Sequence, residues 1–395
     1  MKPSAIHKLT VIAFTCILML GVAACSKPEE PQKPAAVAST EEPQTPAAVA
    51  TTEEPDVVSE ASPYDGPPTD TSKELPVRVI PNIPPAAEAY YASDSLHVIA
   101  QTQDPDAQQP EGGRVGGALT YIFTDEGAEI RRINDRGQDA CSYYFPDMKR
   151  IVWTSTKDNM DMPLGDWSSQ DLYPQGAELY TSDLEGKNIQ RLTDNEYYEA
   201  EVSISPNGEW IVFGRQIDGK LDIWRMRADG SDEQQVTFTD DWQEGAPFYL
   251  PDNETILFRA WKKDEYGKIY PTPMTVFTIK HDGTERTVRT FDRDMNWAPY
   301  PAPDGRHYVF VRVVPGNNWE VFLGDLAGGE PVRLTYHDGF DGLPSLSPDG
   351  TKMLFARAGS DGESLTTYVM DMTSFDIGPE NYKGVPSIEP PPNEG

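Results

Sequence analysis

The sequence predicts an all-β fold, a six-bladed β-propeller of four-stranded antiparallel blades, and two observations lead to this prediction. The first is a repeated phrase, in which two short apolar runs flank a Pro-Asn or Pro-Asp turn, as in Ser203–Phe213. Proline fixes φ for a turn and the residues after it accept positive φ, so the two strands fold back as a hairpin. The second is spacing, because the five prolines lie 45 to 60 residues apart, close to the period of propeller blades. These prolines are Pro146, Pro206, Pro251, Pro303 and Pro348.

A second, weaker hairpin phrase sets the number of blades. It consists of alternating apolar and polar residues typical of a strand, then a glycine-containing turn and a short strand. Its six copies begin at Leu119, Glu178, Asp222, Thr275, Glu320 and Thr367. The first hairpin of the earliest blade is expected within Ala86–Ala100, which has no Pro-Asp turn. Five or seven blades therefore stay open as alternatives to six. The six blades are expected near residues 86–135, 136–195, 196–240, 241–292, 293–337 and 338–376.

Residues 1–24 are predicted to be a lipoprotein signal peptide. Two lysines precede the apolar run Leu9–Val22, which is shorter than a membrane span. The region ends in Val-Ala-Ala-Cys and resembles a bacterial lipobox, in which Cys25 becomes the lipid-modified first residue. The following Ser26, by the sorting rule of that family, favours the outer membrane. An ordinary secretory signal with an incidental cysteine is the alternative.

The stretches on either side of the repeats are predicted to be disordered. Residues 25–85 form a lipid-anchored tether, in which Lys33–Gln44 is nearly repeated by Thr45–Asp56. A segment rich in Pro, Ala and Glu has few large apolar side chains, so burial of apolar surface cannot offset the conformational entropy lost on ordering. The propeller is expected over residues 86–376, and residues 377–395 are expected to be a loose, proline-rich tail.

The charge of the chain excludes some partners. The formal net charge is −31, from 64 acidic and 33 basic residues. Nucleic acid is therefore disfavoured, since phosphates need Lys and Arg. Electrostatic adsorption to anionic lipid is disfavoured for the same reason, so membrane contact is expected through the N-terminal lipid only. Cationic partners or metal ions fit the sign of the charge.

The longer loops are expected on one face of the propeller. If the strands of each blade are called A, B, C and D, the Pro-Asp turn joins A to B on one face. The B–C and D–A loops then lie on the opposite face, here called the long-loop face. The long loops are expected at residues 101–117, 157–176, 262–273 and 314–318. Insertions on one face of a repeat fold often mark its binding face.

A ring of polar side chains is predicted at the channel mouth on this face. Counting seven residues back from each proline gives Asp139, Glu199, Glu244, Asn296 and Asp341, and the aromatic side chains beside them include Tyr198, Trp242, Trp297 and Phe340. Carboxylates held close together raise one another's pKa or recruit a divalent cation such as Ca²⁺. Together with aromatic rings they suit a cationic side chain or a sugar. Alternatively, the carboxylates cap loop N–H groups and the rings pack between blades.

No catalytic motif supports an enzyme, and no cofactor is expected apart from the divalent cation. The sequence has no Gly-x-Ser-x-Gly, no His-Glu-x-x-His and no phosphate-binding glycine loop. Glu199, Glu244 and Asp341 could supply the acid and base of a glycosidase, but the sequence singles out no pair.

The repeated Ser-Pro-Asp-Gly hairpin and the Asp-Gly turn after it resemble those of the TolB-type propellers of bacterial envelopes. The resemblance covers about three quarters of the chain and implies a six-bladed fold. TolB proteins carry an α/β domain before the propeller, whereas here a disordered tether takes that place. We expect a lipoprotein on the periplasmic side of the outer membrane that binds an envelope protein or peptide on its long-loop face. A carbohydrate-binding or carbohydrate-cleaving propeller is the alternative.

Overall fold

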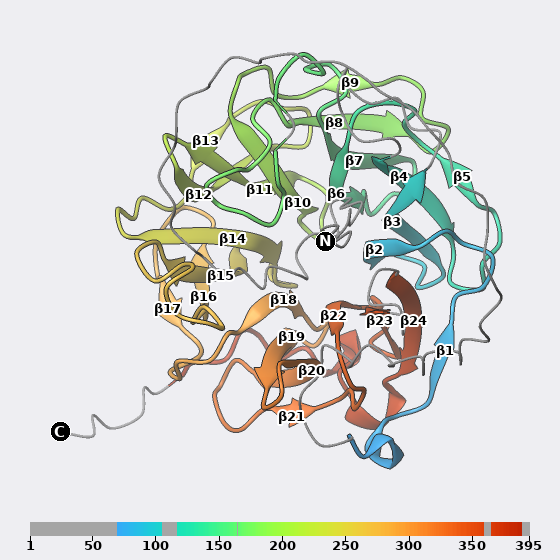
Figure 1. Ribbon diagram of the computed structural model, residues 1–395, viewed down its shortest axis with the longest axis vertical. Helices are drawn as coiled ribbons and strands as arrows, with labels where there is room; N and C mark the ends of the chain where they lie inside the picture. The colour runs from blue at the N-terminus through green and yellow to red at the C-terminus, as the bar shows by residue number, and fades with distance from the viewer. Residues whose placement is uncertain (1–68, 105–116, 164, 359–364, 389–395) are drawn as a thin grey trace, which may run out of the picture. The chain divides into compact units, whose positions relative to one another are not determined.

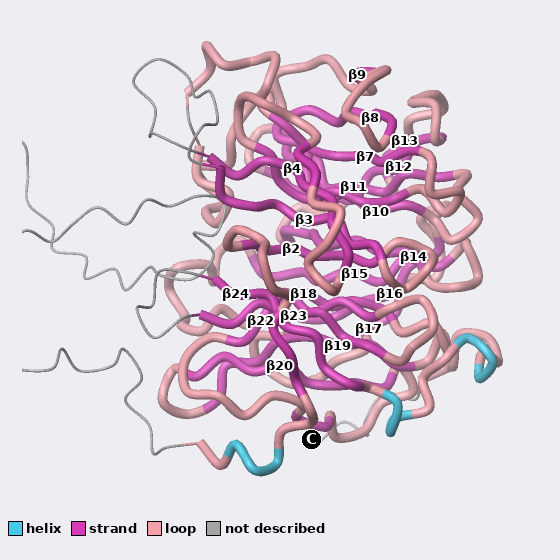
Figure 2. Tube along the Cα trace, turned by 90° about the vertical axis from the view of Figure 1, so that its right-hand side faces the viewer, coloured by secondary structure: helices cyan, strands magenta, loops and turns pink. Residues whose placement is uncertain are grey.

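The computed structural model describes residues 69–104, 117–163, 165–358 and 365–388. Their strands form six four-stranded antiparallel sheets placed around a central axis (Figure 1). The prediction of six four-stranded blades is confirmed. Figure 2 shows the strands from the side, with loops gathered at two opposite faces. Within the described ranges, no helix is long and apolar enough to cross a membrane.

Each blade contains strands A to D from the axis outward. Blade 1 holds β2 (Ala86–Tyr91), β3 (His97–Asp104), β4 (Gly117–Thr124) and β5 (Arg131–Arg132), and blade 2 holds β6 (Asp139–Tyr144), β7 (Arg150–Ser155), β8 (Glu178–Asp183) and β9 (Gln190–Arg191). Blade 3 holds β10 (Tyr198–Ile204), β11 (Trp210–Ile217), β12 (Lys220–Arg227) and β13 (Gln234–Gln235), and blade 4 holds β14 (Trp242–Tyr249), β15 (Thr255–Lys262), β16 (Thr275–Lys280) and β17 (Thr287–Val288). Blade 5 holds β18 (Trp297–Pro301), β19 (His307–Val314), β20 (Asn318–Asp325) and β21 (Val332–Arg333), and blade 6 holds β22 (Asp341–Leu346), β23 (Lys352–Ala358), β24 (Leu365–Asp371) and β1 (Val77–Val79). Short 3-10 helices cover Thr71–Lys73, Thr373–Phe375 and Pro379–Asn381.

The Pro-Asp turns join strands A and B, and the Asp side chain and the glycine of the turn stabilise its conformation. In blade 6 the Asp349 carboxylate accepts from the Ser347 hydroxyl at 2.6 Å and from the Thr351 N–H at 3.0 Å. Gly350 follows with φ of +72°, a conformation that only glycine adopts without strain. In blade 5 the Asp304 carboxylate accepts from two backbone N–H groups in the same way. A side chain thus satisfies turn N–H groups that would otherwise lack a partner.

The sixth blade is closed by a strand from the other end of the chain. β1 pairs antiparallel with β24, matching Val77 with Met370 and Val79 with Tyr368. The Ile80 side chain after it is 2% exposed. Glu74, just before β1, accepts a hydrogen bond from Arg357 of β23. The propeller therefore begins before the predicted range 86–376 and takes in residues that the sequence placed in the tether.

Residues after the last blade also lie against the propeller. The Ile377 side chain is 1% exposed, and Arg289 donates to the Pro386 carbonyl at 2.9 Å. Gly305 has no side chain, and a Cβ there would lie 2.6 Å from the Tyr382 ring. The sequence predicts a loose tail over 377–395, but its described part, 377–388, forms these contacts.

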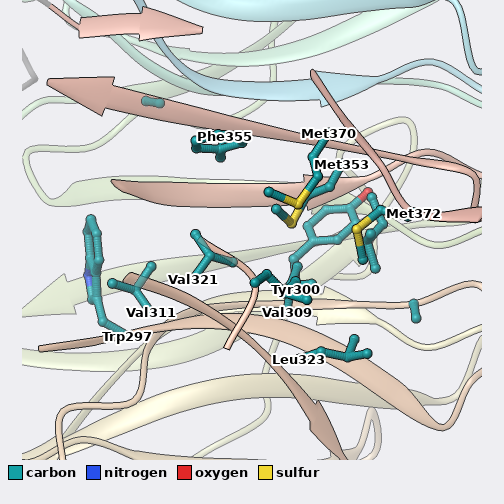
Figure 3. Packing of buried hydrophobic residues seen from close by; sticks show 14 of the residues in the cluster. Trp297, Tyr300, Val309, Val311, Val321, Leu323, Met353, Phe355, Met370 and Met372 are labelled. Carbon is teal, nitrogen blue, oxygen red and sulfur yellow. The ribbon is translucent and has the colours of Figure 1, made fainter. Parts of the chain in front are cut away.

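Apolar side chains fill the spaces between neighbouring blades. Figure 3 shows part of the cluster between blades 5 and 6, where Val311 and Val321 of one blade meet Phe355 and Met370 of the next. All four side chains are almost wholly buried. Such sheet-to-sheet packing is what holds the blades around the axis.

We predict that the N-terminal strand stabilises the closed ring. A chain beginning at residue 81 loses the β1–β24 ladder, the buried Ile80 and the Glu74–Arg357 contact, and should be less stable by about 3 kcal/mol or more. Thermal unfolding followed by circular dichroism measures the change. A chain beginning at residue 69 keeps β1 and serves as the control. Equal unfolding midpoints for the two chains would contradict this role of β1.

Candidate functional site

The five residues predicted to ring the channel mouth occupy equivalent places at the start of strand A or just before it. All five have no exposed surface, and they are Asp139, Glu199, Glu244, Asn296 and Asp341. The axial cavity described below does not include them among its lining residues. Their contacts show what each buried polar group does in its own blade.

An arginine meets the polar residue in four of these blades. Three of the arginines lie on strand B: Arg215 donates to Glu199, Arg312 to Asn296 at 2.9 Å, and Arg357 to Asp341 at 2.7 Å. In blade 4, where Ala260 stands opposite Glu244, the partner is Arg286, which comes from just before β17 and donates at 2.8 Å.

Blade 2 is held differently, because Asp139 has neutral partners. It accepts from the backbone N–H of Thr120 and from the Asn134 amide, both at 2.8 Å. Thr120 belongs to blade 1, so this carboxylate bonds the two blades together. Asp139 therefore bonds to a strand N–H, and the other four residues bond to arginines, whereas the alternative in the sequence analysis was the capping of loop N–H groups.

Burial raises the pKa of these acids. It raises the pKa of Asp139 to about 6 against the lowering effect of its hydrogen bonds. It raises the pKa of Asp341 to about 6 and that of Glu199 to about 7, although Arg357 and Arg215 act in the opposite direction. The free-energy cost of removing the carboxylate from water exceeds the stabilisation that the arginine gives to its charged form, as is common for buried ion pairs.

The predicted aromatic residues pack against neighbouring rings. Tyr198 stacks on Tyr173 with ring centroids 4.3 Å apart. Trp242 meets Phe277 edge-on at 5.5 Å. Trp297 and Phe340 both contact the Trp319 ring, each at 5.7 Å. Of the four predicted rings, Trp297 is the one that also lines the axial cavity.

A β-bulge in every strand A determines which residues reach the axis. In blade 4, for example, Gly245 pairs with Arg259 and Phe248 with Leu257, so two residues oppose one. The same single-residue excess occurs in strand A of the other five blades. Five of the bulges hold a non-glycine residue with φ between 50° and 55°: Glu88, Glu201, Ala246, Ala298 and Leu343. The sixth bulge residue is Cys141 of blade 2.

The six bulge residues line one cavity on the axis, with a volume of about 50 Å³. Phe248, Trp297 and Tyr90 add aromatic surface, and Arg259 of β15 adds a cation. The bulge residues come five positions before the Pro-Asp proline, whereas the predicted ring comes seven before it. Sequence reasoning therefore missed them by two positions along the same strand. The only signal in the sequence was the pair of acids Glu88 and Glu201.

An aromatic layer separates the cavity from the Pro-Asp turns. Two residues beyond the bulge, Tyr90, Tyr143, Phe248 and Tyr300 form ring contacts with one another at 4.8 to 6.3 Å. The hydroxyls of Tyr143 and Tyr300 are 2.8 Å apart and hydrogen-bonded. Because strand A runs toward the Pro-Asp turn, the cavity lies on the long-loop side of this layer.

The loops of the long-loop face carry large apolar side chains that are exposed. Four of the five aromatic side chains that are exposed among the described residues lie on these loops: Tyr197, Phe238, Tyr270 and Phe291. Phe238 and Tyr270 are 73% and 65% exposed. Leu172, on the B–C loop of blade 2, is 58% exposed. Exposed aromatic residues are enriched at protein-binding surfaces.

Two further predictions have no test in this structure. Among the described residues, no group of three or more His, Cys, Asp or Glu side chains is arranged to hold a metal ion, and the divalent cation at the channel mouth stays a prediction. Cys25, the predicted lipidation site, lies outside the described residues.

Comparison with known proteins gives partial similarities, and no family model matches the chain. A stretch of 206 residues is 28% identical to an uncharacterized protein of Agrobacterium fabrum and covers 51% of this chain and 64% of that protein. A stretch of 110 residues is 27% identical to the Tol-Pal system protein TolB of Francisella tularensis and covers 28% of this chain and 24% of TolB. The similarity thus spans less than two thirds of either relative.

Solved structures with related folds include TolB proteins. TolB from Acinetobacter baumannii has a TM-score of 0.49 at 18% identity, covering 73% of this chain and 65% of that chain. A putative TolB from Agrobacterium tumefaciens has a TM-score of 0.49 at 17% identity, covering 75% and 96%. An oligogalacturonate lyase in complex with manganese has a TM-score of 0.45 at 14% identity, covering 76% and 98%. The strand order itself makes the chain a six-bladed propeller, and a stretch of 110 residues is similar in sequence to TolB.

We predict that the Arg215–Glu199 pair stabilises blade 3 and does so in a pH-dependent way. Replacing Arg215 by leucine leaves Glu199 without its cation and should cost about 3 to 5 kcal/mol of unfolding free energy at pH 8. The pKa of Glu199 is about 7 with Arg215 present and should rise further without it. A raised carboxyl pKa favours the folded state at low pH, so the loss should be smaller at pH 5, where Glu199 is protonated.

Denaturant unfolding at the two pH values measures this difference. Arg131→Leu removes an exposed pair with Glu185 and is the control, with an expected loss within about 1 kcal/mol. A loss for Arg215→Leu that is small and the same at both pH values would contradict a structural role for this acid.

Proposed function

We propose that this protein is a non-enzymatic binding protein of the bacterial envelope, whose propeller holds a protein or peptide partner on the long-loop face. The observation that carries the proposal is the exposure of Tyr197, Phe238, Tyr270 and Phe291 on loops of that one face. Exposed aromatic side chains are enriched where a protein partner docks, and four of the five in the described part of the chain lie on this face.

The charge of the chain indicates what kind of partner fits. With a net charge of −31, the protein attracts basic surfaces and repels acidic ones. On the long-loop face, Asp194 and Asp240 have side chains that are 86% and 93% exposed. A partner with basic residues around an apolar centre would match both features of this face.

The predicted lipid anchor at Cys25 belongs to the same proposal. A lipidated N-terminus followed by a long tether would hold the propeller at the periplasmic side of the outer membrane. The likeness to TolB, named for the Tol-Pal system, supports an envelope setting. Failure of a Cys25→Ser variant to leave the membrane fraction would contradict the anchor.

Site-specific photo-crosslinking tests the docking face. A photoreactive phenylalanine analogue replaces Phe238 or Tyr270 in the full-length protein produced in its own cells. We expect a discrete protein adduct from each position, weakened at position 238 when Tyr270→Asp removes part of the apolar surface. The matched control places the analogue at Ile189, which is 43% exposed at the C–D turn on the opposite face.

Two outcomes would contradict the proposal. The first is an equally strong adduct from position 189, which would show that the long-loop face is not selective. The second is the absence of adducts at 238 and 270 together with retention of the protein on an envelope polysaccharide, which would favour the carbohydrate alternative.

A further inference from the structure

The axial cavity has two chemically different halves. In blades 1 to 3 the bulge residues are Glu88, Cys141 and Glu201, and in blades 4 to 6 they are Ala246, Ala298 and Leu343. Phe248 and Trp297 extend the apolar half. A ligand group that fits both halves must therefore combine a polar end with an apolar stem.

One of the two carboxylates already has a cation. Arg259 donates to one oxygen of Glu201 at 2.9 Å, and the Ala246 N–H donates to the other oxygen, also at 2.9 Å. Gly245 allows this approach, because a Cβ there would lie 2.2 Å from the Glu201 carboxylate. The Glu201 charge is thus compensated within the protein.

The second carboxylate has hydrogen bonds but no paired cation. One oxygen of Glu88 accepts from the Cys141 N–H at 3.0 Å and from the Cys141 thiol at 3.3 Å. Among the described residues, no Lys, Arg or His forms an ion pair with Glu88. Two carboxylates and one guanidinium therefore leave the cavity with one uncompensated negative charge when Glu88 is ionised.

The geometry favours an ammonium group over a guanidinium. Both hydrogen bonds from Cys141 use Oε2 of Glu88, and no described residue donates a hydrogen bond to Oε1. A single oxygen suits the point charge of an ammonium, whereas a guanidinium fork is best matched by both oxygens of a carboxylate. A volume of about 50 Å³ admits an ammonium and the end of its alkyl stem.

We propose that the axial cavity binds the side chain of a lysine of the partner, with Glu88 as the counter-ion and Leu343 and Trp297 around the methylene stem. That the lysine comes from a partner rests on the function proposed above. Long cationic side chains bury their methylene stems against apolar surface while the charged end finds its own partner. The partner would enter from the long-loop face, since the aromatic layer lies on the other side.

Ionisation of Glu88 links lysine binding to pH. Burial raises the pKa of Glu88 and is the largest effect, the hydrogen bonds from Cys141 lower it, the charge of Glu201 raises it, and the charge of Arg259 lowers it. The other titratable groups lining the cavity are Cys141, Tyr90, Glu201 and Arg259. Because an ammonium stabilises the ionised carboxylate, affinity should increase as pH rises through the range where Glu88 loses its proton.

Binding of short peptides to the full-length protein tests the inference. The probes are acetyl-Ala-Lys-Ala-amide and the versions with arginine or norleucine in place of lysine, measured by calorimetry. We expect the lysine peptide to bind more tightly than both others. Glu88→Gln keeps the size of the side chain and should weaken the lysine peptide by about tenfold or more. Glu129→Gln changes a carboxylate that is 68% exposed elsewhere on the propeller and should have no effect.

A second variant guards against misfolding at position 88. Ala298→Lys places an ammonium in the cavity from the protein itself and should abolish binding of the lysine peptide. Equal affinity for the lysine and norleucine peptides, or unchanged affinity in Glu88→Gln, would overturn the inference. Photo-crosslinking at Phe238 separates the two proposals, because adducts without lysine-peptide binding refute the cavity alone. Lysine-peptide binding without adducts refutes the docking face and leaves the ammonium site.

Discussion

One extra residue in the inner strand of each blade sets the chemistry of the propeller axis. Five of the six bulges place a residue other than glycine at φ between 50° and 55°, in the left-handed region. Such residues cost of order 1 kcal/mol or more each, so the packing between blades must hold them there. In return, six residues that are far apart in the sequence line a single cavity. The identity of these six residues decides what the axis can bind.

The same bulge explains why some acids of strand A are buried in ion pairs whereas others line the axial cavity. Glu199 and Glu201 are two positions apart, yet Glu199 is buried against Arg215 while Glu201 lines the cavity. Arginines such as Arg215 and Arg357 stabilise acids at the first position, and they bind strand A to strand B. The acids at the second position, Glu88 and Glu201, are the ones that a ligand on the axis can reach.

The sequence was sufficient for the fold because its turns have a strong chemical signature. Pro-Asp and Pro-Asn turns mark five of the six A–B hairpins, and even the turn of blade 1, without proline, was placed correctly within Ala86–Ala100. Val77–Val79 was not expected in the fold, because three residues in a proline-rich stretch show no strand pattern. Their role depends on β24, some 290 residues further on, which has no other neighbour on its outer side.

The candidate site was less predictable than the fold. A glycine in a strand can indicate a β-bulge, but the bulge residues here are Glu, Cys, Ala and Leu, which give no such indication. The change of register at Glu201 could therefore not be predicted from the sequence. Counting along an unbulged strand therefore selected Asp139 and its equivalents. The exposed rings at Phe238 and Tyr270 were also missed, because exposure depends on how a loop folds over its neighbours.

An experimental crystal structure of the protein grown with the lysine peptide is the most direct test of this account. The account predicts a bulge in strand A of every blade, Glu199 and Asp341 on their arginines, and density for an ammonium beside Glu88 on the axis. Density for the ligand against Glu199, Glu244 and Asp341, with those side chains turned to the axis, would contradict it.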